Sequence, residues 1–250
     1  VVSEQRSVNG TTARYWRAST DGADFAIPDN LQSLMAARMD RLDEETRSTL
    51  QIASVIGRSF YYRVLARLTA NGSLPATELD RHLSALVRLE MIQEAARVPE
   101  VEYKFRNPLM QEATYRTILL KRRREFYQRV GEAMEALFPD RLTELAPRLG
   151  HHFAESGDPA RALKFYTLAA DQAARLYANE EALLHYDQAL ALAAEADTPT
   201  LIHLYTSRGR VLEVSARHVE AMESYQRMEA LAVERGDQRL ELAALMAQGT

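Results

Sequence analysis

Small and aromatic residues recur at a fixed spacing in the second half of this 250-residue chain, and this recurrence restricts the fold more than any other feature. A first copy comprises Leu149, Gly150, Phe153, Ala162, Tyr166 and Ala169. A second copy, 59 residues later, comprises Gly209, Leu212, Ala221, Tyr225 and Met228. Small residues let two helices cross closely while aromatic rings fill the space beside the crossing, so the spacing predicts stacked helix pairs.

A half copy lies between these two copies, at Ala182, Tyr186 and Ala189. The spacing is that of the tetratricopeptide pattern, whose helix pairs take about 34 residues, so an offset of 20 residues is too short for a new pair. We therefore expect one long helix, over about 159–177, to close the first unit and open the second. Another unit begins at Gln238, and we expect it to be truncated. The predicted repeat-packing residues are Gly150, Phe153, Ala162, Tyr166, Ala182, Tyr186, Gly209, Ala221 and Tyr225.

The composition changes near residues 140–144, which indicates two modules. Residues 1–143 carry 21 basic and 19 acidic side chains, whereas residues 144–250 carry 10 basic and 16 acidic side chains and 22 alanines. The alanine-rich part is almost wholly helical by pattern. No apolar run approaches the roughly 18 residues of a membrane span, and the chain opens without a signal peptide. We expect a cytoplasmic internal fragment of a larger protein, with no membrane contact.

The first 43 residues mix strand and helix signals. Residues 12–17 and 24–27 predict two strands of a hairpin, separated by a polar turn at 19–22. A helix follows from Pro28 or Asp29, because its apolar residues recur at helical spacing.

Residues 44–106 predict three helices and a second hairpin. Asp43 is a predicted N-cap, and the helix that follows it ends at Gly57. Two more helices are predicted over 61–69 and 76–90, and the last of them carries the apolar stripe Leu79, Leu83, Leu86 and Leu89. Apolar and charged residues then alternate in 101–106, which predicts a strand paired with 91–97. Three helices followed by a β-hairpin is the winged-helix arrangement.

Asn107 and Pro108 supply an N-cap and a first-turn proline for a helix that reaches Phe138, with a break near Leu120. The predicted fold class is therefore mostly α, with a winged-helix module followed by a tetratricopeptide-like αα-solenoid. The predicted domains are 1–43, 44–138 and 140–250.

Several catalytic constellations are missing from the sequence. The three lysines, Lys104, Lys121 and Lys164, are followed by Phe, Arg and Phe, so no phosphate-binding P-loop can be written. The ten glycines form neither a dinucleotide fingerprint nor a nucleophile elbow, and the chain has no cysteine. The neighbouring His151 and His152 would point about 100° apart on a helix, so they do not converge on a metal. We predict no catalytic residue, no metal site and no bound cofactor in this fragment.

A basic run at Lys121–Arg124 invites a nucleic-acid interpretation. Four consecutive helical residues sweep about 300°, however, and so cannot line one groove. The predicted third helix, at 76–90, has more acidic than basic residues, which disfavours phosphate binding. We interpret the run as a solvated or interdomain helix surface and expect no nucleic-acid partner.

Three stretches resemble the segment that follows the ATPase core in bacterial STAND-type AAA ATPases, which are multidomain signalling proteins. They are residues 27–60, 103–138 and 145–173. Some members of that family carry an adenylate/guanylate cyclase domain and others a LuxR-type DNA-binding domain. The resemblance implies that 1–43 is the tail of an ATPase module, 44–138 its winged helix, and 140–250 the start of a sensor. It also implies ATP or ADP and Mg²⁺ in an upstream domain, and a protein, peptide or effector on the repeats.

The sequence departs from this family at one position. Relatives commonly have His after the strand, where this chain has Asn107 in the run FRNPLMQE at 105–112. The resemblance makes Asn107 a candidate nucleotide-facing residue, although its N-cap role also explains it. The leading hypothesis is a non-catalytic segment that couples the nucleotide state of an upstream ATPase domain to a helical-repeat sensor. The alternatives are a winged-helix DNA-binding transcription regulator and a stand-alone repeat scaffold.

Overall fold

The structure is a computed structural model that describes the chain except residues 1, 9–10, 18–34, 36, 70–73 and 250. The chain divides into two units, Val1–Asp40 and Arg41–Thr250. The further division of the second unit into domains at 138–140 stays a prediction.

The first unit contains an antiparallel hairpin of β1 (Val2–Val8) and β2 (Thr11–Arg17). The strand predicted over 12–17 is therefore present. Its predicted partner, residues 24–27, lies outside the described residues, and the structure instead pairs β2 with β1, which the sequence did not predict. Most of the helix predicted from Pro28 also lies outside them, although residues 35 and 37–39 are helical.

The second unit begins with α2 (Glu44–Ile56), and both of its ends follow the sequence prediction. The Asp43 Oδ1 atom accepts a hydrogen bond of 2.8 Å from the backbone N–H of Thr46. At the other end, Gly57 has a φ of 136°, which a side chain would strain, and its N–H donates to Ala53. The predicted cap and stop are confirmed.

A three-stranded antiparallel sheet packs with α2, α3 (Tyr62–Leu68) and α4 (Ala76–Arg88). Its strands are β3 (Ser59–Tyr61), β4 (Ile92–Ala96) and β5 (Glu102–Phe105), with β5 in the centre. The predicted β4–β5 hairpin is confirmed. Strand β3 was missed, because three residues directly before a helix are too few to show the period of a strand.

The helix α4 corrects one predicted core residue. Leu79, Leu83 and Leu86 are buried as predicted, but Leu89 is 38% exposed. The helix ends at Arg88, and Glu90 turns the chain with a φ of 55°, so Leu89 leaves the buried stripe.

Two helices then lead from the sheet to the array. Asn107 caps α5 (Pro108–Arg116), and the predicted break near Leu120 falls just before α6 (Leu120–Leu137). A 3-10 turn, Pro139–Arg141, follows.

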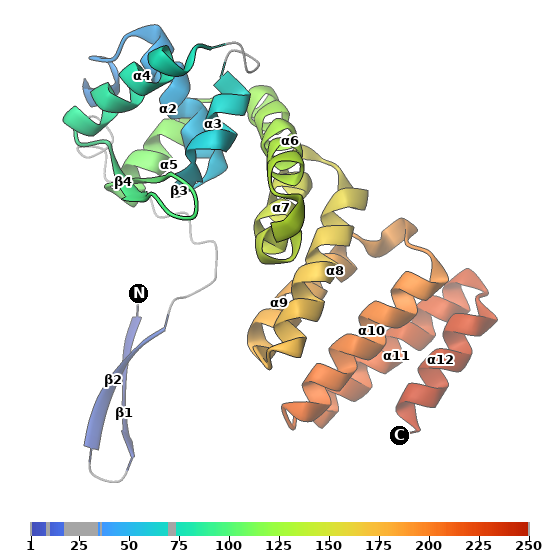
Figure 1. The fold of residues 1–250 in the computed structure, drawn as a ribbon. Coiled ribbons are helices and arrows are strands. Elements are labelled where there is room, and N and C mark those ends of the chain that lie inside the picture. Colours follow the sequence, from blue (N-terminus) through green and yellow to red (C-terminus); the bar gives the residue numbers. More distant parts are fainter. Residues whose placement is uncertain (1, 9–10, 18–34, 36, 70–73, 250) are drawn as a thin grey trace. The chain divides into compact units, whose positions relative to one another are not determined.

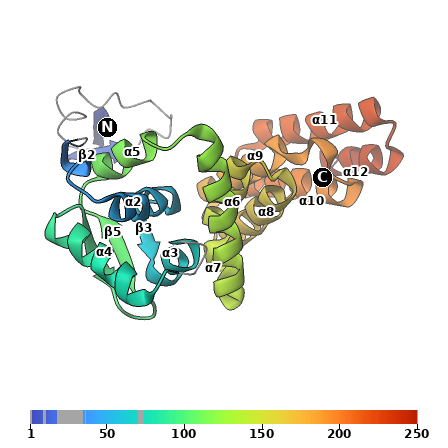
Figure 2. The ribbon, with the colours of Figure 1, turned by 90° about the horizontal axis from the view of Figure 1, so that it is seen from above.

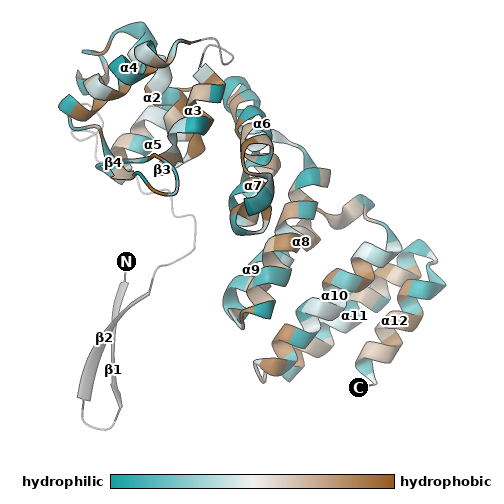
Figure 3. Cartoon of the chain, in the orientation of Figure 1, coloured by the Kyte–Doolittle hydropathy of each residue, from teal (hydrophilic) through white to brown (hydrophobic). Residues whose placement is uncertain are grey.

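Six helices follow as an array in which successive helices pack side by side (Figure 1; Figure 2). They are α7 (Leu142–Ser156), α8 (Pro159–Arg175), α9 (Asn179–Ala191), α10 (Thr198–Val214), α11 (His218–Arg235) and α12 (Gln238–Gln248). The long helix α8 packs on both α7 and α9, as predicted. Hydrophobic and hydrophilic residues alternate around these helices (Figure 3), which gives each one a buried face. Among the described helices, none has the length and hydropathy needed to cross a membrane.

Candidate binding site in the helical array

Glycine–tyrosine contacts set the spacing between α7 and α8 and between α10 and α11, and two of these helices, α8 and α10, carry the candidate site. A Cβ atom at Gly150 would lie 2.7 Å from Cδ1 of Tyr166, and one at Gly209 would overlap the ring of Tyr225. Glycine at these positions therefore lets each ring press against the backbone of the preceding helix. All nine predicted repeat-packing residues are buried: Gly150, Phe153, Ala162, Tyr166, Ala182, Tyr186, Gly209, Ala221 and Tyr225.

Among the described glycines, a similar contact occurs once where the sequence did not predict it. A Cβ atom at Gly131 would lie 2.8 Å from the ring of Phe153, so α6 packs on α7 as α7 packs on α8. Gly131 lies inside a helical pattern, but it precedes residue 140, where the predicted repeats begin.

Hydrogen bonds fix two of the tyrosine rings. The hydroxyl of Tyr186 donates to Asp171 at 2.7 Å, and the hydroxyl of Tyr225 donates to Glu213 at 2.8 Å. Burial raises the pKa of both phenols above the usual range, and these bonds to carboxylates raise it further. His203 Nε2 lies 2.9 Å from the same Asp171 carboxylate, so this acid joins α8, α9 and α10.

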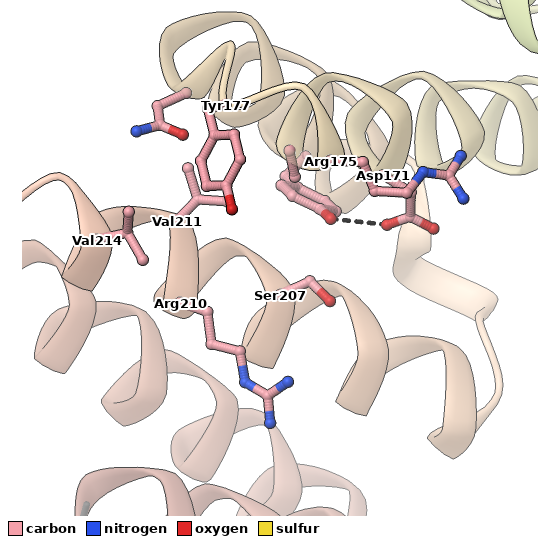
Figure 4. A pocket seen from close by; sticks show the side chains of 10 residues that line it. Asp171, Arg175, Tyr177, Ser207, Arg210, Val211 and Val214 are labelled. Carbon is pink, nitrogen blue, oxygen red and sulfur yellow. Dashed lines mark hydrogen bonds between the residues drawn. The ribbon is translucent and has the colours of Figure 1, made fainter.

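A cavity of about 400 Å³ opens between α8, α9 and α10 (Figure 4). Ala174, Val211 and Val214 form much of its apolar wall. The remaining lining residues are polar or aromatic, and they are Asp171, Arg175, Tyr177, Asn179, Tyr186, Ser207 and Arg210. A concave site with an apolar wall and a few polar groups is the usual form of a ligand site.

The exposed groups of this cavity include an aromatic ring, an aliphatic side chain and two cations. Tyr177 is 79% exposed and Val214 is 69% exposed. Arg175 and Arg210 are also exposed, and neither forms an ion pair with any described residue. These groups suit an apolar side chain with an acidic neighbour. The sequence did not predict this site: Tyr186 follows the repeat pattern, but the pattern does not specify polar residues such as Asp171, Ser207 and Arg210.

The helix α7 is held against strand β3 by two arginines. A guanidinium nitrogen of Arg148 donates to the carbonyl oxygen of Ser59 at 3.1 Å, and the group lies 5.4 Å from the centre of the Tyr61 ring. Arg141 donates to the Tyr61 hydroxyl at 3.2 Å. Burial lowers the pKa of Arg148 from its high ordinary value, and the side chain stays cationic. The first helix of the array is thereby joined to the sheet.

Asn107, the candidate nucleotide-facing residue, is half-buried at the start of α5. Its Oδ1 atom accepts a hydrogen bond of 2.9 Å from the backbone N–H of Leu109. This bond satisfies one of the free donors of the helix end, as an N-cap does. A role in nucleotide sensing stays a prediction.

The described residues include one group whose donor atoms lie close enough together for a metal ion. Asp43, Glu45 and His82 each offer an atom within 4.8 Å of the others. The guanidinium of Arg81 lies 3.2 Å from Nε2 of His82 and 3.6 Å from Glu45, and Nδ1 of His82 lies 3.0 Å from the Thr49 hydroxyl. A cation already sits among these donors, so the group does not fit a divalent metal.

The basic run at the start of α6 is divided between contacts and solvent. Arg123 lies over the Tyr115 ring and donates to the carbonyl of Ile118, whereas Lys121 and Arg124 are exposed. These side chains do not form one continuous basic face.

Comparison with known proteins yields little similarity. No protein-family model matches the chain, and no curated protein matches it. A similar solved structure is the Signal Transduction ATPase with Numerous Domains (STAND) protein with a tetratricopeptide repeat sensor from Pyrococcus horikoshii. The match has 13% sequence identity and a TM-score of 0.29, and it covers 87% of this chain and 42% of that chain. This chain therefore spans less than half the length of that protein.

Proposed function

We propose that this chain is a non-catalytic regulatory and interaction segment of a multidomain STAND ATPase, and that its helical array binds a protein or peptide. The cavity between α8, α9 and α10 carries the proposal. It combines an apolar wall, an exposed Tyr177 and the unpaired Arg210 on three helices that the Asp171 carboxylate joins through Tyr186 and His203. A binding site on such rigid elements keeps its geometry.

The part of the chain before the array acts as a winged helix in this proposal. Its order of helix, strand, two helices and two strands, with β5 central in the sheet, supports that assignment. Residues 1–43 form the tail of the ATPase module, and ATP with Mg²⁺ belongs to an upstream domain. The contacts of Arg141 and Arg148 with strand β3 support a path between the winged helix and the array.

A role in reading DNA through α4 is less well supported. Arg81, one of two basic residues on that helix, forms an ion pair of 2.9 Å with Glu78. An arginine held by a neighbouring carboxylate contributes less to a phosphate contact.

Selection of peptides on the 250-residue chain tests the binding site. We expect selected peptides to contain an apolar residue beside an acidic one, because the cavity offers an apolar wall beside Arg210. Val214→Lys places a charge on that wall and is expected to weaken the selected peptides at least about 10-fold. Val233→Lys is the matched control, because Val233 is 64% exposed and lies outside the cavity. Equal loss in both variants, or no selected peptide, would contradict the proposal.

Two further measurements test the coupling and the division of labour. Arg148→Met removes the bond to Ser59 while keeping an unbranched, flexible side chain. We expect peptide binding to protect strand β3 from hydrogen exchange in the wild-type chain and not in Arg148→Met. The chain alone should not bind ATP. Tight ATP binding by these 250 residues would place the nucleotide site here and overturn the proposal.

A further inference from the structure

A second cavity, of about 650 Å³, lies where three distant segments of the chain meet. The end of α2 with the turn to β3 forms one wall, α5 forms the second, and α6 with α7 forms the third. This cavity is separate from the one in the array, since the two share no lining residue.

A buried histidine lines this cavity without a hydrogen-bond partner. His152 is 2% exposed, its Nδ1 atom is fully enclosed, and neither ring nitrogen bonds to a described residue. Burial holds the pKa of His152 well below its ordinary value, and the charges of the neighbouring His151 and Arg148 lower it further. The ring is therefore neutral. A neutral imidazole has one donor and one acceptor, and buried polar groups of this kind normally have partners.

The charges that line the cavity favour an anion. Arg58 and Arg148 both line it and form no ion pair with a described residue, whereas the lining Glu112 is paired with Arg116 at 2.7 Å. The one other acid of the lining is Glu155, which is exposed. Two guanidinium groups without an ion pair therefore line the cavity together with one unpaired carboxylate, and the site is left with a net positive charge.

Aromatic rings form one side of the same cavity. The centre of the Tyr127 ring lies 6.2 Å from the centre of the Tyr115 ring and 5.7 Å from that of the His151 ring. Both pairs are edge to face. The His152 ring lies 5.7 Å from Tyr127. Rings arranged in this way offer edges and faces to another planar ring.

We propose that this cavity binds an aromatic carboxylate, with its ring against Tyr127 and His151 and its carboxylate toward Arg58 and Arg148. Such a ligand would contact both the α2–β3 turn and α7, and would hold these segments together. The site does not depend on what the helical array binds.

Titration of the 250-residue chain with indole-3-acetate and salicylate tests the ligand class. NMR spectra of the histidine rings should show saturable shifts of the His151 and His152 signals. Indole-3-ethanol, which lacks the charge, should bind at least about 10-fold more weakly, because charge-assisted hydrogen bonds are lost. No saturable shift with either carboxylate would overturn the proposal. Equal binding of indole-3-ethanol would refute the role of charge, and equal binding of inorganic phosphate would refute the role of the ring.

Two exposed residues provide variants that leave the folded core intact. Arg58→Gln and His151→Ala should each weaken indole-3-acetate at least about 5-fold. Arg124→Gln is the matched control, because Arg124 is exposed, has no ion pair with a described residue and lies outside the cavity. If Arg124→Gln weakened binding as much as Arg58→Gln, the attraction would be non-specific and the proposed site would be wrong.

Discussion

In residues 44–138 the buried core is assembled from distant parts of the chain, whereas in residues 142–248 helices pack mainly on near neighbours in sequence. Phe60 on β3 contacts Tyr103 and Phe105, more than 40 residues away on β5. In the array, Gly150 and Tyr166 come from consecutive helices, and so do Gly209 and Tyr225. The first arrangement couples all of its elements, while the second joins units pairwise. We therefore expect the first to unfold as a whole and the array to open locally.

Replacement of one buried phenylalanine in each region tests this difference, with the largest expected effect. Phe60→Ala and Phe153→Ala both truncate a side chain with no exposed surface, and each should lower the free energy of unfolding by about 3–5 kcal/mol. Hydrogen exchange distinguishes the two regions. Phe60→Ala should remove protection from α2 through β5 together, whereas Phe153→Ala should affect mainly α6, α7 and α8. If Phe60→Ala removed protection from β3 alone, residues 44–138 would not unfold as a whole.

A smaller effect is expected from adding one methyl group in the array. Gly209→Ala places a Cβ atom on the Tyr225 ring, and overpacking of this kind costs about 1–3 kcal/mol. Alanine favours a helix over glycine by about 1 kcal/mol, so the net loss should be roughly 0–2 kcal/mol in urea unfolding. The control is the same substitution in a Tyr225→Ala background, where the overlap is gone and Gly209→Ala should become stabilising. A loss of equal size in both backgrounds would show that the ring contact does not limit the helix spacing.

The local signals of the sequence predicted most helices correctly. Asp43, Gly57 and Asn107 mark helix ends by side-chain hydrogen bonds or backbone conformation, which depend on a few adjacent residues. The shared helix α8 followed from the 20-residue offset between Ala162 and Ala182. Predictions failed where tertiary structure decides. Strand β3 exists because β5 lies beside it. Leu89 is exposed because α4 ends at Arg88, one residue before it.

Neither cavity could be predicted from the sequence. The cavity in the array depends on how α10 crosses α8 and α9, and no spacing in the sequence specifies that crossing. The second cavity brings the turn at Gly57 next to His152, almost one hundred residues later. His152 looked like an ordinary helical residue, and only its burial without a partner distinguishes it.

The smallest effect is expected at the N-cap that begins the non-local region. Asp43→Ala removes the bond to the Thr46 N–H and should cost about 1 kcal/mol of the free energy of unfolding. That bond lowers the pKa of the Asp43 carboxyl below its ordinary value. The stabilisation is therefore complete above the unfolded-state pKa, near about 4, and is lost as the pH falls through the lower folded-state pKa. Asp43→Asn keeps an acceptor that does not titrate, so it should retain most of the stability and remove this part of the pH dependence. If the non-local region unfolds as one unit, Asp43→Ala should lower protection as far away as β5. Fraying of only the first turn of α2 would show that this region is less cooperative than its contacts imply.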